Sequence, residues 1–133
     1  MTRGRCFGTE SPFNAWVRLN CRDAQAGLAA SDLDLVLFDW KAGRLAVVES
    51  KARGGEPSFS QRDLLHVVHQ LLAAGAAAGP VETARGRRTI DYRGLYLVQL
   101  SGTTPDDSDR ILVNGAPVTK EQLARLLSLE EGT

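Results

Sequence analysis

The stretch Ser31–Gly55, SDLDLVLFDWKAGRLAVVESKARGG, decides the fold. It contains two apolar runs, at 33–40 and 44–50, that are joined by the short segment KAG. Two runs of strand length with a short glycine-containing connection are typical of a β-hairpin. Charged side chains gather at the open end of the two runs, and these are Asp32, Asp34, Glu49 and Lys51. The sequence therefore predicts a hairpin that carries acids and an ammonium group at one end.

The segments around this hairpin predict helices on both sides of it and a further strand. Ser11-Pro12 is typical of a helix start, and capping-box patterns begin at Ser60 and Thr119. Residues 95–100, LYLVQL, have the continuous apolar character of a central strand, whereas residues 80–91 are polar and basic and are expected to form a loop. The predicted elements are helices at 12 to about 20–23, 60–79 and 120–129, and strands at 33–40, 44–50, 95–100, 111–113 and 116–118. This order indicates an α/β (α+β) fold in which helices flank a short mixed sheet.

Length and composition indicate one globular domain, residues 1–133, with 43% hydrophobic and 24% charged residues. No apolar stretch reaches the ~20 residues of a membrane-spanning helix, and the first residues lack the apolar segment of a signal peptide. Cys6 and Cys21 are too few for a disulfide framework or a four-ligand zinc site. We expect free thiols in the cytoplasm of a bacterial, archaeal or phage-infected cell.

The charge distribution is less neutral than the net charge of zero. Most of the sixteen basic residues are arginines, whose planar fork donates two hydrogen bonds to phosphate oxygens. The net charge argues against a nucleic-acid partner, but the clustering of arginines favours one. The clusters are Arg3 and Arg5, Arg18 and Arg22, Lys51 and Arg53, and Arg85, Arg87 and Arg88.

The register of the hairpin decides which charged groups face each other. If the turn pairs Asp39 with Arg44, Asp34 lies directly opposite Glu49. A turn shorter by two residues places Asp34 opposite Lys51, but it also sets two like charges across from each other, which is disfavoured. Either register places Asp34, Glu49 and Lys51 on one face, because side chains alternate along a strand.

This combination of groups fits the hydrolysis of a phosphodiester. Two neighbouring carboxylates repel each other unless a cation joins them. Mg²⁺ or Mn²⁺ suits them, because such ions take oxygen ligands, activate water and neutralise charge on a phosphoryl oxygen. The Lys51 ammonium is expected to position the attacking water or to stabilise the charged phosphate.

The motif Asp34-(x)14-Glu49-Ser50-Lys51, between an N-terminal helix and a long helix, resembles the core of the PD-(D/E)xK nuclease superfamily. The resemblance covers about residues 5–100 and implies a restriction-endonuclease-like core with the element order α-β-β-β-α-β. Leu33 stands where the superfamily's name has proline. Asp32 competes as the first acid, and Asp34 is preferred because the apolar strand follows it directly.

Within the superfamily the chain is most similar to the Holliday-junction resolvases of the archaeal type. This resemblance implies a Mg²⁺-dependent endonuclease that acts as a homodimer on four-way DNA junctions. It also implies a third site acid, for which Glu10 is the candidate, after a basic segment that holds Arg3 and Arg5. Gln70 is a candidate accessory contact, and Arg53, Arg85, Arg87 and Arg88 are candidate contacts to backbone phosphates. Residues 101–133 have no counterpart, which leaves a phage or mobile-element variant open.

Several other interpretations stay open. Asp34, Glu49 and Lys51 would also fit a structural ion cluster, and Glu10 would also favour the start of the first helix. Ser50 is expected to face the other side of the strand with a structural role only, and Trp40 is expected in the core. The same nuclease chemistry would serve nicking, restriction or repair. A DNA-binding protein without catalysis on the same fold is the alternative from another class.

Overall fold

The computed structural model describes residues 11–21 and 33–130, and the chain divides into two compact units, residues 1–32 and 33–133. The described part of the first unit contains helix α1 (Pro12–Asn20). Its start is as predicted, because the Ser11 side chain accepts a hydrogen bond from the Asn14 backbone N–H at 3.0 Å.

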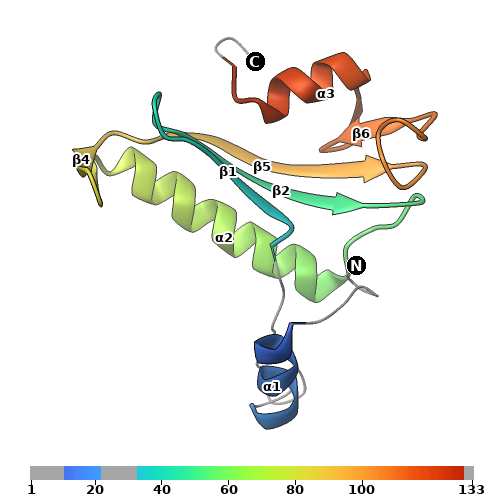
Figure 1. Ribbon diagram of the computed structural model, residues 1–133, viewed down its shortest axis with the longest axis horizontal. Helices are drawn as coiled ribbons and strands as arrows, with labels where there is room; N and C mark the ends of the chain where they lie inside the picture. Colours follow the sequence, from blue (N-terminus) through green and yellow to red (C-terminus); the bar gives the residue numbers. More distant parts are fainter. Residues whose placement is uncertain (1–10, 22–32, 131–133) are drawn as a thin grey trace. The chain divides into compact units, whose positions relative to one another are not determined.

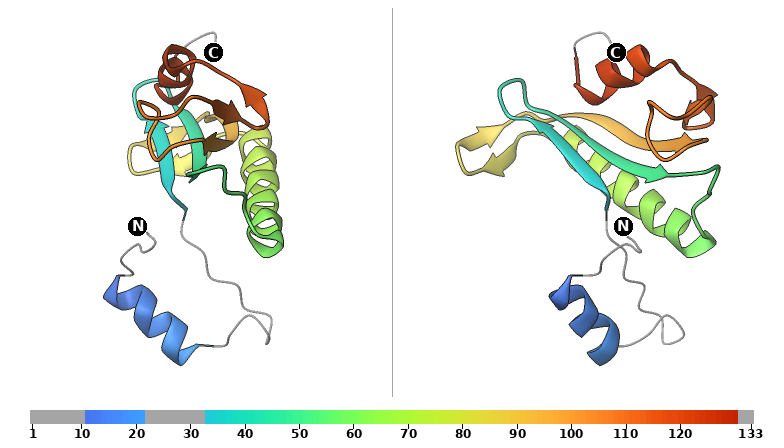
Figure 2. Two further views of the ribbon diagram at one scale, coloured as in Figure 1. Left: turned by 90° about the vertical axis from the view of Figure 1, so that its right-hand side faces the viewer. Right: turned by 45° about the vertical axis from the view of Figure 1, so that its right-hand side comes forward.

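The second unit contains a five-stranded mixed sheet with the strand order β1-β2-β5-β6-β7. Strands β2 and β5 are parallel and the other neighbours are antiparallel. Figures 1 and 2 show helix α2 on one face of this sheet and helix α3 on the other. The elements are β1 (Leu35–Asp39), β2 (Arg44–Lys51), α2 (Phe59–Ala77), β3 (Val81–Thr83), β4 (Gly86–Arg88), β5 (Asp91–Leu100), β6 (Ile111–Val113), β7 (Ala116–Pro117) and α3 (Lys120–Leu127). The predicted mixed sheet between helices is confirmed.

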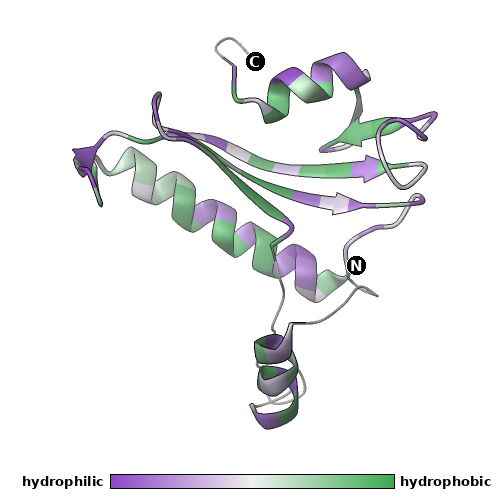
Figure 3. Ribbon diagram, in the orientation of Figure 1, coloured by the Kyte–Doolittle hydropathy of each residue, from purple (hydrophilic) through white to green (hydrophobic). Residues whose placement is uncertain are grey.

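Helix α2 connects the parallel strands β2 and β5 and runs back along the sheet. Its N-cap is Ser58, whose side chain accepts a hydrogen bond from the Gln61 backbone N–H at 3.2 Å. The helix therefore begins two residues earlier than the capping box predicted at Ser60. The first turns of the helix are mostly hydrophilic (Figure 3). Leu65, one turn further on, is buried against the sheet. The polar start of α2 therefore lies at the end of β2 that carries the charged motif.

The opposite face of the sheet holds the main core. Residues 101–130 supply much of it, because β6 and β7 extend the sheet and α3 covers this face. Helix α3 begins with the predicted capping box, in which Thr119 and Gln122 bond reciprocally. The buried cluster consists of Val48, Val98, Leu100, Ile111, Val113 and Leu123.

Three features differ from the sequence prediction. The expected loop at 80–91 contains the β3–β4 hairpin, whose turn is closed by hydrogen bonds of the Thr83 hydroxyl and by Gly86 at φ 101°. Strand β5 begins at Asp91, four residues before the predicted start. Trp40 lies at the β1–β2 turn and is exposed, because a turn tip has no layer above it.

The element order also bears on the resemblance to the nuclease superfamily. Between α1 and α2 the described residues form two strands, where the superfamily has three, and residues 22–32 lie outside the described part. Within residues 11–21 and 33–130, no helix has the length and apolar character needed to cross a membrane.

Candidate active site

The β1–β2 hairpin has the register that pairs Asp39 with Arg44, one of the two registers predicted from the sequence. The Asp39 carboxylate accepts hydrogen bonds from the backbone N–H groups of Ala42 at 3.0 Å and Lys41 at 3.1 Å. These bonds, together with the nearby Arg44 guanidinium, hold the pKa of Asp39 below its ordinary value of 3.8. Asp39 thus fixes the turn, and the register brings Asp34 opposite Glu49 at the other end of the hairpin.

Glu49 is a carboxylate buried inside the protein. Its side chain is 3% exposed, and it is the one buried charged residue among those that the structure describes. Its Oε2 atom accepts a hydrogen bond from Gln61 Nε2 at 2.9 Å and lies 3.8 Å from Lys51 Nζ. Its Oε1 atom accepts from the Asp34 backbone N–H at 3.4 Å. Burying a carboxylate is costly unless such donors surround it, so these neighbours are what allow Glu49 to stay there.

Asp34 lies just before the first paired residue of β1 and is exposed. Its Oδ2 atom accepts two hydrogen bonds from Ser50, one from the backbone N–H at 2.9 Å and one from the hydroxyl at 2.8 Å. The last residue pair between β1 and β2 is Leu35 with Val48. Ser50 lies past this pair, and its backbone N–H donates to the Asp34 carboxylate instead of to a strand carbonyl of β1. Ser50 was expected to face the other side of the strand with a structural role only, and the structure shows that it donates two hydrogen bonds to Asp34.

We call Asp34, Glu49, Ser50, Lys51 and Gln61 the hairpin-end cluster. It lies where the parallel strands β2 and β5 end, and the first turn of α2 supplies Gln61. In open sheets with parallel strands, ligands bind at this carboxyl edge, and the positive end of a helix dipole favours an anionic group there. Gln61 was missed as a site residue because it directly follows Ser60, where the sequence indicated the start of the helix.

Other residues predicted for the site lie elsewhere. Gln70 is exposed and follows Gln61 by nine positions, about 13 Å along the helix axis. His69, on the same helix, shares a hydrogen bond of 2.9 Å with the Tyr92 hydroxyl. The remaining candidates Arg3, Arg5, Glu10 and Asp32 lie outside the described residues.

Those arginines predicted to contact DNA that the structure describes fall into two places. Arg53 is exposed two residues after Lys51, in a turn where its φ of 55° is left-handed. Arg85, Arg87 and Arg88 belong to the β3–β4 hairpin, and Arg88 Nη1 donates to the Trp40 carbonyl at 2.7 Å. These three therefore lie by the β1–β2 turn, at the opposite end of β2 from the hairpin-end cluster. The seven residue steps along β2 correspond to about 23 Å.

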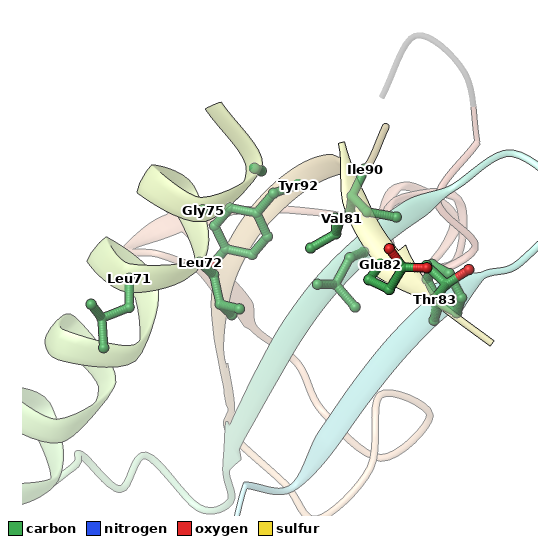
Figure 4. A pocket seen from close by; sticks show the side chains of 11 residues that line it. Leu71, Leu72, Gly75, Val81, Glu82, Thr83, Ile90 and Tyr92 are labelled. Carbon is green, nitrogen blue, oxygen red and sulfur yellow. The ribbon is translucent and has the colours of Figure 1, made fainter. Parts of the chain in front are cut away.

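A cavity of about 430 Å³ lies between α2, the β1–β2 hairpin and the β3–β4 hairpin (Figure 4). Leu72, Val81, Ile90 and Tyr92 contribute to its mostly apolar wall. Burial raises the pKa of the Tyr92 hydroxyl above its ordinary value of 10.0. None of the residues of the hairpin-end cluster lines this cavity.

The hairpin-end cluster has donors that suit a hard divalent cation. Asp34 and Glu49 offer carboxylate oxygens, which Mg²⁺ and Mn²⁺ prefer, and the Asp34 carboxylate is exposed to solvent whereas that of Glu49 is buried. Within the described ranges no group of three or more His, Cys, Asp or Glu side chains is arranged for a metal ion. Glu10, the predicted third acid, is not among those ranges.

Comparison with known proteins found no match to a family model, to a curated protein or to a solved structure.

Proposed function

We propose that the chain is a metal-dependent endonuclease that hydrolyses phosphodiesters in DNA. The observation that carries the proposal is the carboxylate of Glu49, 3% exposed and 3.8 Å from Lys51 Nζ, opposite the exposed Asp34. A buried ionic cluster usually stabilises a fold less than apolar packing would, so a cluster at an open sheet edge is a candidate for function.

Each residue of the hairpin-end cluster has a role in this proposal. Asp34 and Glu49 would hold Mg²⁺ or Mn²⁺, with Glu10 as the third acid that the family resemblance implies. The bound ion would act as a Lewis acid toward the phosphodiester. Lys51 would bind a phosphate oxygen or orient the attacking water, since its ammonium group already lies beside Glu49.

The two uncharged members of the cluster keep the acids in place. Gln61 donates to Glu49 Oε2 and fixes the orientation of that carboxylate. Ser50 fixes Asp34 through two donors to a single oxygen, which leaves Asp34 Oδ1 for a ligand. Such supporting contacts affect metal affinity in known sites.

Holliday-junction resolution is the task that we propose, and it is supported by the resemblance of the motif. Two strands of a junction must be cut, so the proposed active form is a homodimer with one site in each subunit. Arginine-rich segments would bind the backbone phosphates.

A DNA-binding protein without catalysis remains a second candidate. It is favoured by the internal hydrogen bonds of both acids, because Ser50 and Gln61 already satisfy Asp34 Oδ2 and Glu49 Oε2. In that case the cluster would be a structural ion network and would tolerate loss of the Asp34 carboxylate.

Cleavage of labelled DNA tests the proposal. A four-way junction and a linear duplex of matched sequence are incubated with Mg²⁺, Mn²⁺ or EDTA. The proteins are the wild type, Lys51→Ala and the control Lys120→Ala, whose exposed ammonium pairs with Asp106 at 3.5 Å on another part of the fold. We expect metal-dependent cutting that is lost in Lys51→Ala and kept in Lys120→Ala.

The pattern of cutting separates the candidates. Paired symmetric nicks in the junction alone support a resolvase, whereas cutting of both substrates supports a nuclease with another task. DNA binding without cutting in any metal would overturn the catalytic proposal.

A further inference from the structure

Trp40 presents an exposed indole at the β1–β2 turn, far from the hairpin-end cluster. The side chain is 52% exposed even though two cations lie against its ring. The Arg85 guanidinium carbon is 4.7 Å from the ring centroid and Lys41 Nζ is 5.4 Å from it. Both distances are within the range of cation–π attraction. An aromatic ring framed by cations is therefore open to solvent at this place.

The position of Trp40 is fixed by contacts between two distant segments of the chain. Arg88 Nη1 donates to the Trp40 carbonyl at 2.7 Å and Nη2 to the Lys41 carbonyl at 3.4 Å. The Gly43 carbonyl accepts from the Asp91 N–H at 2.8 Å, which ties the turn to the start of β5. The turn and the β3–β4 hairpin thus form one surface, which we call the Trp40 patch. Its side chains are Trp40, Lys41, Arg85, Arg87 and Arg88.

The Trp40 patch carries an excess of positive charge. Three acids lie nearby, and each of them already has partners. Asp91, at the start of β5, lies 3.8 Å from Arg93. Asp39 accepts the backbone hydrogen bonds of the turn and lies 3.9 Å from Arg44. Glu82 lies 3.9 Å from Arg87, and both are exposed. Within the described part of the chain, no carboxylate forms an ion pair with Lys41 or Arg85, which lie beside the indole, so the patch attracts anions.

An exposed aromatic ring among cations matches one class of ligand in particular. Single-stranded nucleic acids offer base faces for stacking and phosphates for arginine and lysine, and both contacts are known to contribute to their binding. A base inside a duplex has its faces covered by its neighbours, so it cannot stack on a protein ring. We propose that the Trp40 patch binds single-stranded DNA by stacking an unpaired base on Trp40, while Lys41 and Arg85 contact the flanking phosphates.

This inference deepens the proposed function and rests on DNA being the substrate. The patch and the hairpin-end cluster lie at opposite ends of β2, about 23 Å apart along the strand. One DNA strand can reach both places. The substrate class would then be branched or partly melted DNA with unpaired bases at this distance from the bond that is cut.

Fluorescence of Trp40 provides the test. The chain has two tryptophans, so the variant Trp16→Phe isolates the emission of Trp40. Single-stranded oligothymidylate, a fully paired duplex and inorganic polyphosphate are titrated in EDTA, where no metal-dependent cutting occurs. We expect the single strand to quench the emission, because stacking brings a base against the indole, and polyphosphate to bind with little quenching.

Variants of the full chain then measure the contribution of the patch to affinity. Trp40→Ala is expected to weaken single-strand binding about 5- to 150-fold. Arg85→Ala, which leaves the Arg88 hydrogen bonds in place, is expected to weaken it about 2- to 5-fold. Circular dichroism checks that both variants are folded, and Trp16→Phe serves as the matched control with wild-type affinity.

The outcomes separate this inference from the proposed nuclease activity. Equal affinity of Arg85→Ala, Trp40→Ala and wild type, or equal quenching by polyphosphate, would overturn the inference even if the protein cuts DNA. Quenching by single strands in a protein that cuts nothing would support the inference and count against the nuclease.

Discussion

Replacing Gln61 by alanine should destabilise the protein through the buried carboxylate of Glu49. The variant removes the donor that lies 2.9 Å from Glu49 Oε2, in a place where the glutamate is 3% exposed and water cannot substitute well. A hydrogen bond to a charged group contributes about 1.5–3 kcal/mol, so we expect the free energy of unfolding to fall by that amount in EDTA. For a cooperative unit of about 100 residues, the corresponding fall in Tm is roughly 7–14 °C.

Gln70→Ala is the matched control, because it makes the same change in the same helix. Gln70 is exposed, so its replacement should change the free energy of unfolding by less than about 0.5 kcal/mol. Both variants change helix propensity in the same direction, which the comparison cancels to within a few tenths of a kcal/mol. The assay is urea unfolding followed by circular dichroism at 25 °C. If the two variants are equally stable, Glu49 does not depend on Gln61 and its description as a carboxylate held by this donor is refuted.

Three further predictions concern other parts of the second unit. Ser50→Ala removes one of the two donors to Asp34 and should lower the affinity for Mg²⁺ about 10-fold in calorimetry, whereas Ser50→Thr should retain it. Equal Mg²⁺ affinities of Ser50→Ala and wild type would contradict the proposal that Ser50 supports the Asp34 ligand. Val47→Ala, at 1% exposure, should cost about 2 kcal/mol of unfolding free energy. Val36→Ala, on the same face of the sheet at 51% exposure, should cost less than about 1 kcal/mol of unfolding free energy. Similar losses in the two valine variants would contradict the burial of Val47. Hydrogen bonds from the Thr104 backbone and the Thr103 side chain keep the pKa of Asp107 below its ordinary value of 3.8. The Asp107 carboxylate therefore stabilises the folded state at pH values above 3.8, and this stabilisation is lost as the pH falls through the lower pKa of the folded protein. Asp107→Asn should therefore be less stable than wild type near neutral pH, and urea unfolding should show this difference closing below about pH 3.8; a constant difference would contradict it.

The sequence left two hairpin registers open, and local charge favoured the one that the structure shows. The shorter turn would have paired Lys41 with Arg44, and the repulsion between them disfavours it without any knowledge of the rest of the fold. The helix starts at Ser11 and Thr119 were predictable for a similar reason, since capping involves only neighbouring residues. The start of α2 was ambiguous because Ser58 and Ser60 are both possible caps.

Tertiary contacts explain what the sequence did not reveal. The β3–β4 hairpin has few apolar residues, and Arg88 holds it by carbonyls 47 and 48 positions away in the chain. No local pattern shows such a contact. Trp40 was expected in the core because it sits at an apolar-periodic position, whereas its place at a turn leaves it exposed.

The candidate site was predictable only in part, because some of its contacts also depend on the tertiary structure. Strand alternation placed Glu49 and Lys51 together, and the register added the backbone of Asp34. The direction of the Asp34 carboxylate depends on where the strand ladder ends, which leaves the Ser50 N–H to be satisfied. The contact of Gln61 depends on how α2 crosses the sheet.

All side chains of the hairpin-end cluster come from residues 34–61, one continuous piece of chain. Their contacts span at most sixteen positions, whereas the core below α3 joins β2 to residues near the C-terminus. Short loops close quickly and at small entropic cost, so we expect this piece to order early in folding, before α3 docks. A single recombination event would also transfer the whole cluster, so this set of contacts could pass between chains with different C-terminal segments.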